Sequence, residues 1–182
     1  MSWIETPPEG RYGWPMRIVF ALQRRKFGRV LEPVKLWGRT PRVFFAFLRL
    51  YRTFERESSP LEPALRSLVM VRVSQINWCR FCVDLNASHA LERGVDENRL
   101  RALENFAESP LFDEREKAAL AFAEAMTITG HGVDQGLRAR LKAQFGDDAL
   151  IELAGLIAYQ NMSSKFNAGL DVPPQGFCRL PE

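Results

Sequence analysis

The sequence predicts an all-α protein, for two reasons. Apolar residues recur at helical spacing along most of the chain, and capping residues or Gly and Pro breakers separate the repeats. Strand signals are weak throughout. The chain has 182 residues, enough to bury about two-thirds of its unfolded surface. We therefore expect a helical core that needs neither metals nor disulfides to fold.

The first third of the chain is expected to hold two helices. Pro and Gly residues up to Pro15 act as breakers before a short helix over 16–27. Thr40 followed by Pro41 has the pattern of an N-cap with Pro at the first helical position, so the second helix should run from there to about Glu57. Ser58, Ser59 and Pro60 end it.

Two helices are expected next, around the cysteine motif. Residues 61–75 place apolar side chains near 3.6 spacing, although Val69, Val71 and Val73 could also alternate as a strand. Helix is the favoured interpretation. The following helix runs from Cys79 to about Arg93 and ends at Gly94, the expected position for a glycine in a left-handed cap.

Four further helices are expected in the rest of the chain. Asp96 caps the first, acidic residues occupy the first turn of the second, and Asp147 or Asp148 caps the last. That last helix is long and apolar, which indicates burial. The expected ranges are 96–107, 112–128, 133–144 and 147–169, followed by an irregular tail over 172–182.

Charge is unevenly divided. Residues 11–53 contain 11 Arg or Lys against the single acid Glu32, a local balance of +10, so with a net charge of +3 the rest sums to −7. Aromatic residues are interleaved with these bases, a mixture that could suit nucleic acid or an anionic membrane surface. The favoured interpretation is that the rings pack on the protein's own core or a neighbouring subunit, since no nucleic-acid motif is present. We expect residues 1–57 to form a basic aromatic arm and 58–182 a helical domain with an irregular tail.

Several classes of protein are disfavoured. The start of the chain has no signal-peptide pattern, and Arg49 and Glu152 interrupt the longest apolar runs well before the roughly 20 residues that a membrane span needs. A soluble cytoplasmic protein with reduced cysteines, no membrane insertion and no nucleic-acid partner is therefore expected. The nucleotide-binding glycine motifs and the G-x-S-x-G motif are also missing, which disfavours nucleotide enzymes and serine hydrolases.

The candidate chemistry lies in Cys79-Arg80-Phe81-Cys82, a C-x-x-C at the start of an expected helix. Two cysteines three apart on a helical turn can close a disulfide, and a helix N-terminus stabilises a thiolate and favours nucleophilic attack. Arg80 would add positive charge. Asn86 and His89 follow Cys82 by four and seven residues, so they lie on the same helical stripe, and His89 could reach the thiol through water or Asn86.

Other interpretations of the same residues remain open. The cysteines could be buried core thiols, or they could form a zinc site with His89 and the distant Cys178. His89 could also be a surface histidine with no role. His131 lies between two glycines and reads as a loop residue, and Cys178 reads as a free thiol in the tail.

The chain resembles the carboxymuconolactone decarboxylase and alkylhydroperoxidase D superfamily over roughly residues 58–175. The resemblance is carried, in order, by LRSLVMVRVSQINWCRFCVDLNASHALERGV, FDEREKAALAFAEAMT and DDALIELAGLIAYQNMSSKFNAGLDV. It implies an AhpD-like helical bundle that is usually a homo-oligomer. In the branch with C-x-x-C, it implies reduction of a small-molecule peroxide with electrons from a dithiol reductant, with no metal and no organic cofactor.

The resemblance also implies roles for individual residues. By position, Cys82 would be the peroxidatic cysteine and Cys79 the resolving one. The family's proton relay does not carry over: its glutamate aligns with Ser67, the histidine four residues after the second cysteine aligns with Asn86, and Phe81 stands where some members have histidine.

The missing relay predicts a slow peroxidase in which His89 acts through water. The competing hypothesis is a non-enzymatic oligomeric helical protein whose dithiol senses oxidation or fastens the helix. A third hypothesis is a lyase similar to carboxymuconolactone decarboxylase, although the ring-decarboxylating branch generally lacks the dithiol.

Overall fold

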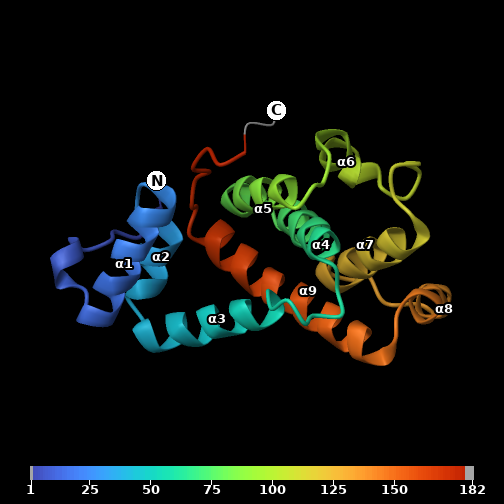
Figure 1. Ribbon diagram of the computed structural model, residues 1–182, viewed down its shortest axis with the longest axis horizontal. Helices are drawn as coiled ribbons and strands as arrows, with labels where there is room; N and C mark the ends of the chain where they lie inside the picture. Colours follow the sequence, from blue (N-terminus) through green and yellow to red (C-terminus); the bar gives the residue numbers. More distant parts are fainter. Residues whose placement is uncertain (1, 179–182) are drawn as a thin grey trace.

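The structure is a computed structural model that describes residues 2–178 (Figure 1), and within that range it contains helices and no strand, as predicted. Two short 3-10 helices, Glu9–Arg11 and Ala102–Asn105, accompany the α-helices. The α-helices are α1 Trp14–Phe27, α2 Glu32–Gly38, α3 Pro41–Phe54, α4 Pro63–Ile76, α5 Arg80–Glu92, α6 Glu97–Arg101, α7 Glu114–Thr127, α8 Gln135–Gln144 and α9 Asp147–Gly169.

The centre of the molecule is α4, which packs against α5, α7 and α9. Its residues from Leu65 to Val71 are all buried, as is Val73. A helix that is buried all round carries apolar residues on every face, and for that reason the valines at 69, 71 and 73 also fit strand alternation. The preference for helix over strand in this segment is confirmed.

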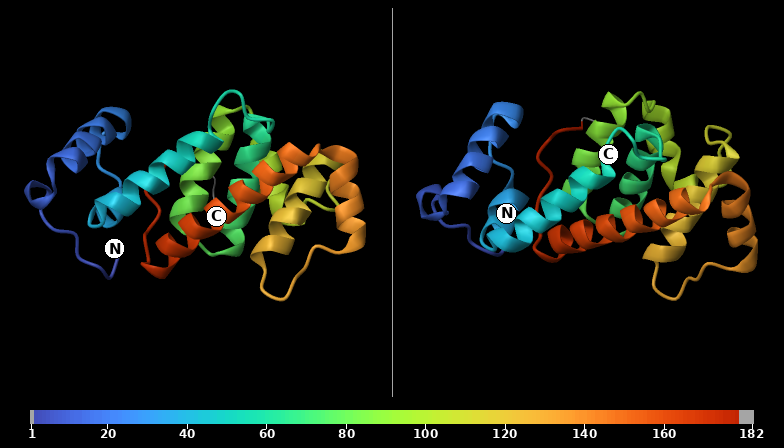
Figure 2. Two further views of the ribbon diagram at one scale, coloured as in Figure 1. Left: turned by 90° about the horizontal axis from the view of Figure 1, so that it is seen from below. Right: turned by 60° about the horizontal axis from the view of Figure 1, so that its bottom comes forward.

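The arm helices α1–α3 have an apolar cluster of their own, whose members are Tyr12, Met16, Phe20, Val30, Trp37 and Phe44. Figure 2 shows α1 and α2 at one end of the molecule and α3 alongside α9. Two aromatic contacts join the arm to α9: Trp37 stacks on Phe166 with ring centroids 3.8 Å apart, and Phe47 on Tyr159 at 4.8 Å. Most rings of the basic segment thus pack on this chain, although Trp14 is 73% exposed and Phe45 38%. The division at residue 57 stays a prediction.

A tight turn joins α4 to the cysteine helix. Trp78 has φ +54°, a left-handed conformation that bulky residues rarely adopt, and its side chain is 88% exposed. Cys79 then serves as the N-cap of α5, since its Sγ accepts a hydrogen bond from the Cys82 N–H at 3.2 Å. At the other end of α5, Gly94 has φ +81°, as a left-handed cap requires.

The C-terminal tail lies across α5, and the side chains of Asp84 and Arg29 bind its backbone. The buried carboxylate of Asp84 accepts backbone N–H bonds from Gln175, Phe177 and Cys178 at 2.7, 2.8 and 2.7 Å. Phe177 in turn meets Phe81 edge to face. The tail therefore covers the start of the cysteine helix; its last residues, 179–182, lie outside the described range.

One helix was not predicted. The helix α2 spans seven residues between two expected helices, begins with Pro33 in its first turn, and has no side-chain hydrogen bond at its N-cap Leu31. It is held instead by burial of Leu36 and Trp37. Such tertiary contacts leave no periodic signal in so short a segment.

Several expected boundaries were also wrong. The first helix begins at Trp14 rather than residue 16, and α3 ends at Phe54 rather than near Glu57. The helix expected over 96–107 is a short α6 followed by a 3-10 turn, although Asp96 does cap it. The N-cap of α9 is Gly146, and Asp147 and Asp148 lie in its first turn instead.

Thr40 occupies the expected N-cap position of α3, but its hydroxyl donates to the Trp37 carbonyl at 3.1 Å and makes no cap hydrogen bond. No helix within residues 2–178 is long and apolar enough to cross a membrane.

Candidate active site

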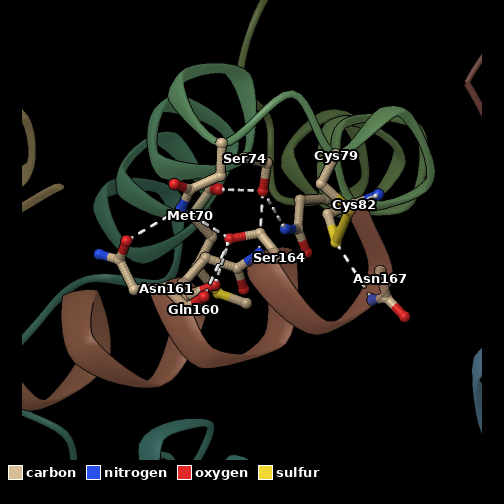
Figure 3. Close-up of a disulfide and its surroundings, with 10 residues drawn as sticks. Met70, Ser74, Cys79, Cys82, Gln160, Asn161, Ser164 and Asn167 are labelled. Atoms are coloured by element: carbon tan, nitrogen blue, oxygen red, sulfur yellow. Dashed lines mark hydrogen bonds between the residues drawn. A yellow bond between two sulfur atoms is a disulfide. The ribbon is translucent and has the colours of Figure 1, made fainter. Parts of the chain in front are cut away.

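The structure brings the two predicted cysteines together (Figure 3). Cys79 and Cys82 form a disulfide, with their Cα atoms 5.2 Å apart, inside the range that a disulfide requires. Both side chains are buried. The sequence led us to expect thiols, whereas the structure holds this pair in its oxidised form. Cys178 is a free thiol, as expected.

An open pocket of about 360 Å³ lies between the arm and the helices α5 and α9. Cys82 lines this pocket, and Cys79 is not among its lining residues. The two members of the pair therefore differ in position, since Cys82 borders the pocket and Cys79 does not. The arm supplies aromatic walls, Phe27, Trp37, Phe44, Phe47 and Tyr51; α4, α5 and α9 supply Met70, Phe81, Leu85 and Tyr159.

Asn167 is a polar residue in direct contact with the Cys82 sulfur, and the sequence analysis did not identify it. Its Nδ2 donates a hydrogen bond to Cys82 Sγ at 3.3 Å (Figure 3), and the whole side chain is 3% exposed. Its Oδ1 is buried and has no hydrogen-bond partner among the described residues. Asn167 also lines the pocket, but this oxygen is closed to solvent in the structure.

Asn86 lies in the pocket wall, and a buried polar network holds it there. Its Nδ2 donates to Ser74 Oγ at 3.2 Å, and Gln160 Nε2 donates to the same oxygen at 2.9 Å. Ser74 Oγ passes its own hydrogen to the Met70 carbonyl at 2.6 Å (Figure 3). Because Asn86 and Gln160 both line the pocket, Ser74 fixes two of its polar side chains at once.

His89 also lines the pocket, half-buried. Burial lowers the pKa of its imidazole, and Glu92 opposes this only in part. The ring is therefore neutral at neutral pH and can donate one hydrogen bond, but it is not a ready source of protons.

Two of the predicted supporting residues lie elsewhere. Ser67 is buried on α4, where its Oγ accepts a hydrogen bond from Arg93 at 2.9 Å, and it is not part of the pocket wall. Arg80 is exposed at the start of α5. His131 is exposed in the turn after α7, as expected of a loop residue.

The charged groups in the pocket wall are all basic. Lys26 from α1 and Arg52 from α3 line it, and the lining contains no Asp or Glu. Burial raises the pKa of Tyr51 to about 12 and also raises the pKa of Tyr159, so both phenols are neutral at neutral pH. Within residues 2–178, no three His, Cys, Asp or Glu side chains are placed to hold a metal ion, which removes support for the zinc interpretation.

Comparison with known proteins places the chain in a family. The model of the carboxymuconolactone decarboxylase family matches residues 42–125, which include the C-x-x-C. The uncharacterized protein YnjA of Escherichia coli K12 is 42% identical over 97% of this chain and 97% of its own length.

Solved structures share the fold at low identity. The debrominase Bmp8, in a complex with 2,3,4-tribromopyrrole, superposes with a TM-score of 0.82 at 23% identity, covering 97% of this chain and 95% of its own. An uncharacterized peroxidase-related protein from Silicibacter sp. TM1040 gives 0.84 at 22% identity, covering 96% and 92%. The family match, together with the near full-length relative, shows that the chain belongs to the carboxymuconolactone decarboxylase family.

Proposed function

We propose that this protein is a thiol-dependent, peroxidase-like oxidoreductase in which Cys82 reacts with an organic hydroperoxide and Cys79 resolves the product. The observation that carries the proposal is the unequal placement of the pair. Cys82 lines the pocket, and Cys79 lies within disulfide reach of it without lining the pocket. A substrate in the pocket meets one sulfur, and the other is positioned to form the disulfide.

The chemistry balances without a cofactor. The Cys82 thiolate attacks the terminal oxygen of ROOH, the O–O bond breaks, and ROH leaves after protonation, with Cys82 oxidised to a sulfenic acid. The Cys79 thiol then attacks that sulfur and water leaves as the disulfide forms. An external dithiol returns two electrons and two protons, so each cycle converts ROOH and a dithiol into ROH, water and a disulfide.

Asn167 takes part in this scheme through the nitrogen of its amide. Its Nδ2, which donates to Cys82 Sγ, stabilises a thiolate relative to a thiol. The amide thereby holds Cys82 in the form that attacks the peroxide.

Proton delivery is the weak part of the site. The family glutamate and histidine positions hold Ser67 and Asn86, and Ser67 is turned away from the pocket. His89 is neutral and can only assist as a hydrogen-bond donor. Since general acid catalysis typically contributes about 10²–10⁴-fold, turnover should be slow by comparison with a site that has a relay.

The test is to trap the intermediate in single-cysteine variants. The reduced protein is treated with one equivalent of cumene hydroperoxide and a sulfenic-acid reagent, and the peptides are mapped. Cys79→Ser should accumulate a trapped sulfenic acid on Cys82, and Cys82→Ser should accumulate none on Cys79; Cys178→Ser is the matched control and should behave as wild type. Trapping on Cys79 alone would reverse the roles, and three unreacted thiols after an hour would remove the peroxidase function.

A second candidate is reductive debromination of an aromatic ring. The aromatic lining of the pocket favours it, because flat rings stack well on Trp, Phe and Tyr. A debrominase with this fold binds 2,3,4-tribromopyrrole. The balance is ArBr plus a dithiol giving ArH, HBr and a disulfide. Bromide release from 2,3,4-tribromopyrrole with dithiothreitol, dependent on Cys82, would support this reaction; none above the Cys82→Ser background would exclude that substrate.

A further inference from the structure

Among the described residues, the basic arm contributes the only full charges that line the pocket. Residues 11–53 carry 11 bases and one acid, and two of these bases, Lys26 and Arg52, line the pocket together with Cys82. The wall contains no carboxylate, and its two phenols and its imidazole are uncharged at neutral pH. The charged side chains that line the pocket are therefore positive among the described residues, and two carboxylates that act on its wall, Glu55 and Glu92, lie outside the lining.

These two bases are not engaged in ion pairs, in contrast to others of the arm. Arg24 and Lys35 both pair with Glu9. Neither Lys26 nor Arg52 forms a salt bridge within the described part of the chain. The Lys26 ammonium lies 5.0 Å from the ring centroid of Phe27, another residue of the pocket wall, which favours its position at the pocket.

The rest of the wall suits an apolar body. The Phe47 ring stacks on Trp37 with centroids 5.0 Å apart and on Tyr159 at 4.8 Å, so the three rings form a continuous aromatic face. All three line the pocket. The volume of about 360 Å³ is near the lower end of the roughly 300–1,000 Å³ typical of small-molecule sites, which points to a compact ligand.

We propose that the basic aromatic arm is the substrate-recognition wall, and that it selects a compact apolar hydroperoxide bearing a carboxylate, which Lys26 and Arg52 bind while the aromatic face holds the body. This inference rests on the proposed function for its reaction. The carboxylate takes no part in bond making or breaking; it fixes the orientation of the substrate in the pocket. Electrostatic complementarity of this kind selects between ligands of similar shape.

The test compares two substrates that share a body and differ in charge and by one methyl group. These are the para-carboxylate of cumene hydroperoxide and its methyl ester, assayed for kcat/KM with excess reductant. Wild type should prefer the acid by about tenfold, a ratio that two partly exposed ion pairs can supply, and the preference should shrink as ionic strength rises. In the Lys26→Gln/Arg52→Gln variant the ratio of acid to ester should fall to within about twofold of one.

The matched control is Arg25→Gln/Arg49→Gln. It removes the same charge from the same two helices, at positions that do not line the pocket. It should keep the tenfold preference. A wild-type ratio near one, or an equal loss of preference in the control, would overturn the recognition proposal and leave thiol peroxidation intact.

A binding measurement tests the anion site separately from the proposed peroxidase reaction. In a Cys79→Ser/Cys82→Ser protein, calorimetry should detect 4-isopropylbenzoate binding more tightly than its methyl ester, and the Lys26→Gln/Arg52→Gln changes should remove the difference. Selective binding without any cysteine oxidation in the wild-type protein would retain the anion site and refute the proposed function. Equal binding of acid and ester would refute the anion site.

Discussion

Replacing Asn167 with Leu is expected to slow the reaction of reduced Cys82 with electrophiles by about tenfold to a hundredfold. The structure places Asn167 Nδ2 3.3 Å from Cys82 Sγ, in a site where the amide is 3% exposed. A hydrogen bond to a charged group contributes about 1.5–3 kcal/mol, and each 1.4 kcal/mol is roughly a factor of ten in the thiol–thiolate equilibrium. Removing the bond therefore lowers the thiolate population by that factor wherever the thiol predominates.

The same substitution should cost little stability. Asn167 Oδ1 is already buried without a partner among the described residues, so Leu removes an unsatisfied acceptor together with the donor. Leu has the same branched shape but bulkier methyl groups, and the pocket that Asn167 lines leaves room for the added volume. We expect the free energy of unfolding to change by less than about 1 kcal/mol. A slower reaction then reflects the lost bond to sulfur, not a disrupted site.

The assay is alkylation of reduced Cys82 by iodoacetamide, followed by mass spectrometry in a Cys178→Ser background. Asn161→Leu is the matched control, because Asn161 lies on the same helix and bonds to Thr127 and Asn77 but not to sulfur. It should lower stability and leave the alkylation rate unchanged. An Asn167→Leu rate within twofold of wild type would refute the assignment of Asn167 to the thiolate.

Three further predictions concern stability. Burial lowers the pKa of His89 in the folded state, so the unfolded state takes up a proton at higher pH than the folded state. The free energy of unfolding should therefore decrease as the pH is lowered below about 6.5. His89→Gln should flatten this part of the profile of urea midpoint against pH, and an unchanged slope would contradict the burial argument. Asp84→Asn puts an amide among three backbone N–H donors and should lower the free energy of unfolding by about 1–3 kcal/mol. Amide hydrogen exchange over residues 172–178 should become faster. Unaltered exchange there would show that the carboxylate does not hold the tail. Trp78 holds a left-handed backbone conformation and its side chain is 88% exposed, so Trp78→Gly should relieve backbone strain and lose little packing. The free energy of unfolding from urea denaturation should rise by about 1 kcal/mol, and a decrease would contradict the strain at this residue.

The fold was predictable where its signals are local. The helix α7 begins with a capping box, Asp113 and Glu116, and such pairs can be recognised within four residues of sequence. The identity of α4 as a helix followed from its spacing. The helix α2 was not predictable, because it depends on packing of Leu36 and Trp37 against residues far away in the chain.

The candidate site divides in the same way. Cys79 and Cys82 are three residues apart, so their proximity follows from helical geometry alone, and Asn86 and His89 follow on the same stripe. Asn167 reaches the sulfur from α9, 85 residues later, and no local pattern marks it. Ser67, expected near the dithiol by alignment, bonds to Arg93 outside the pocket.

The position of the arm has a consequence for how this protein can diverge from its relatives. The family model begins at residue 42, yet Lys26, Phe27 and Trp37 of the pocket wall precede it. Part of the pocket wall thus lies before the family match and part of it, including Arg52, lies inside the match. On the proposed recognition, substitutions before residue 42 can change the charge and shape of the wall beside Cys82 without altering the redox pair or its helix.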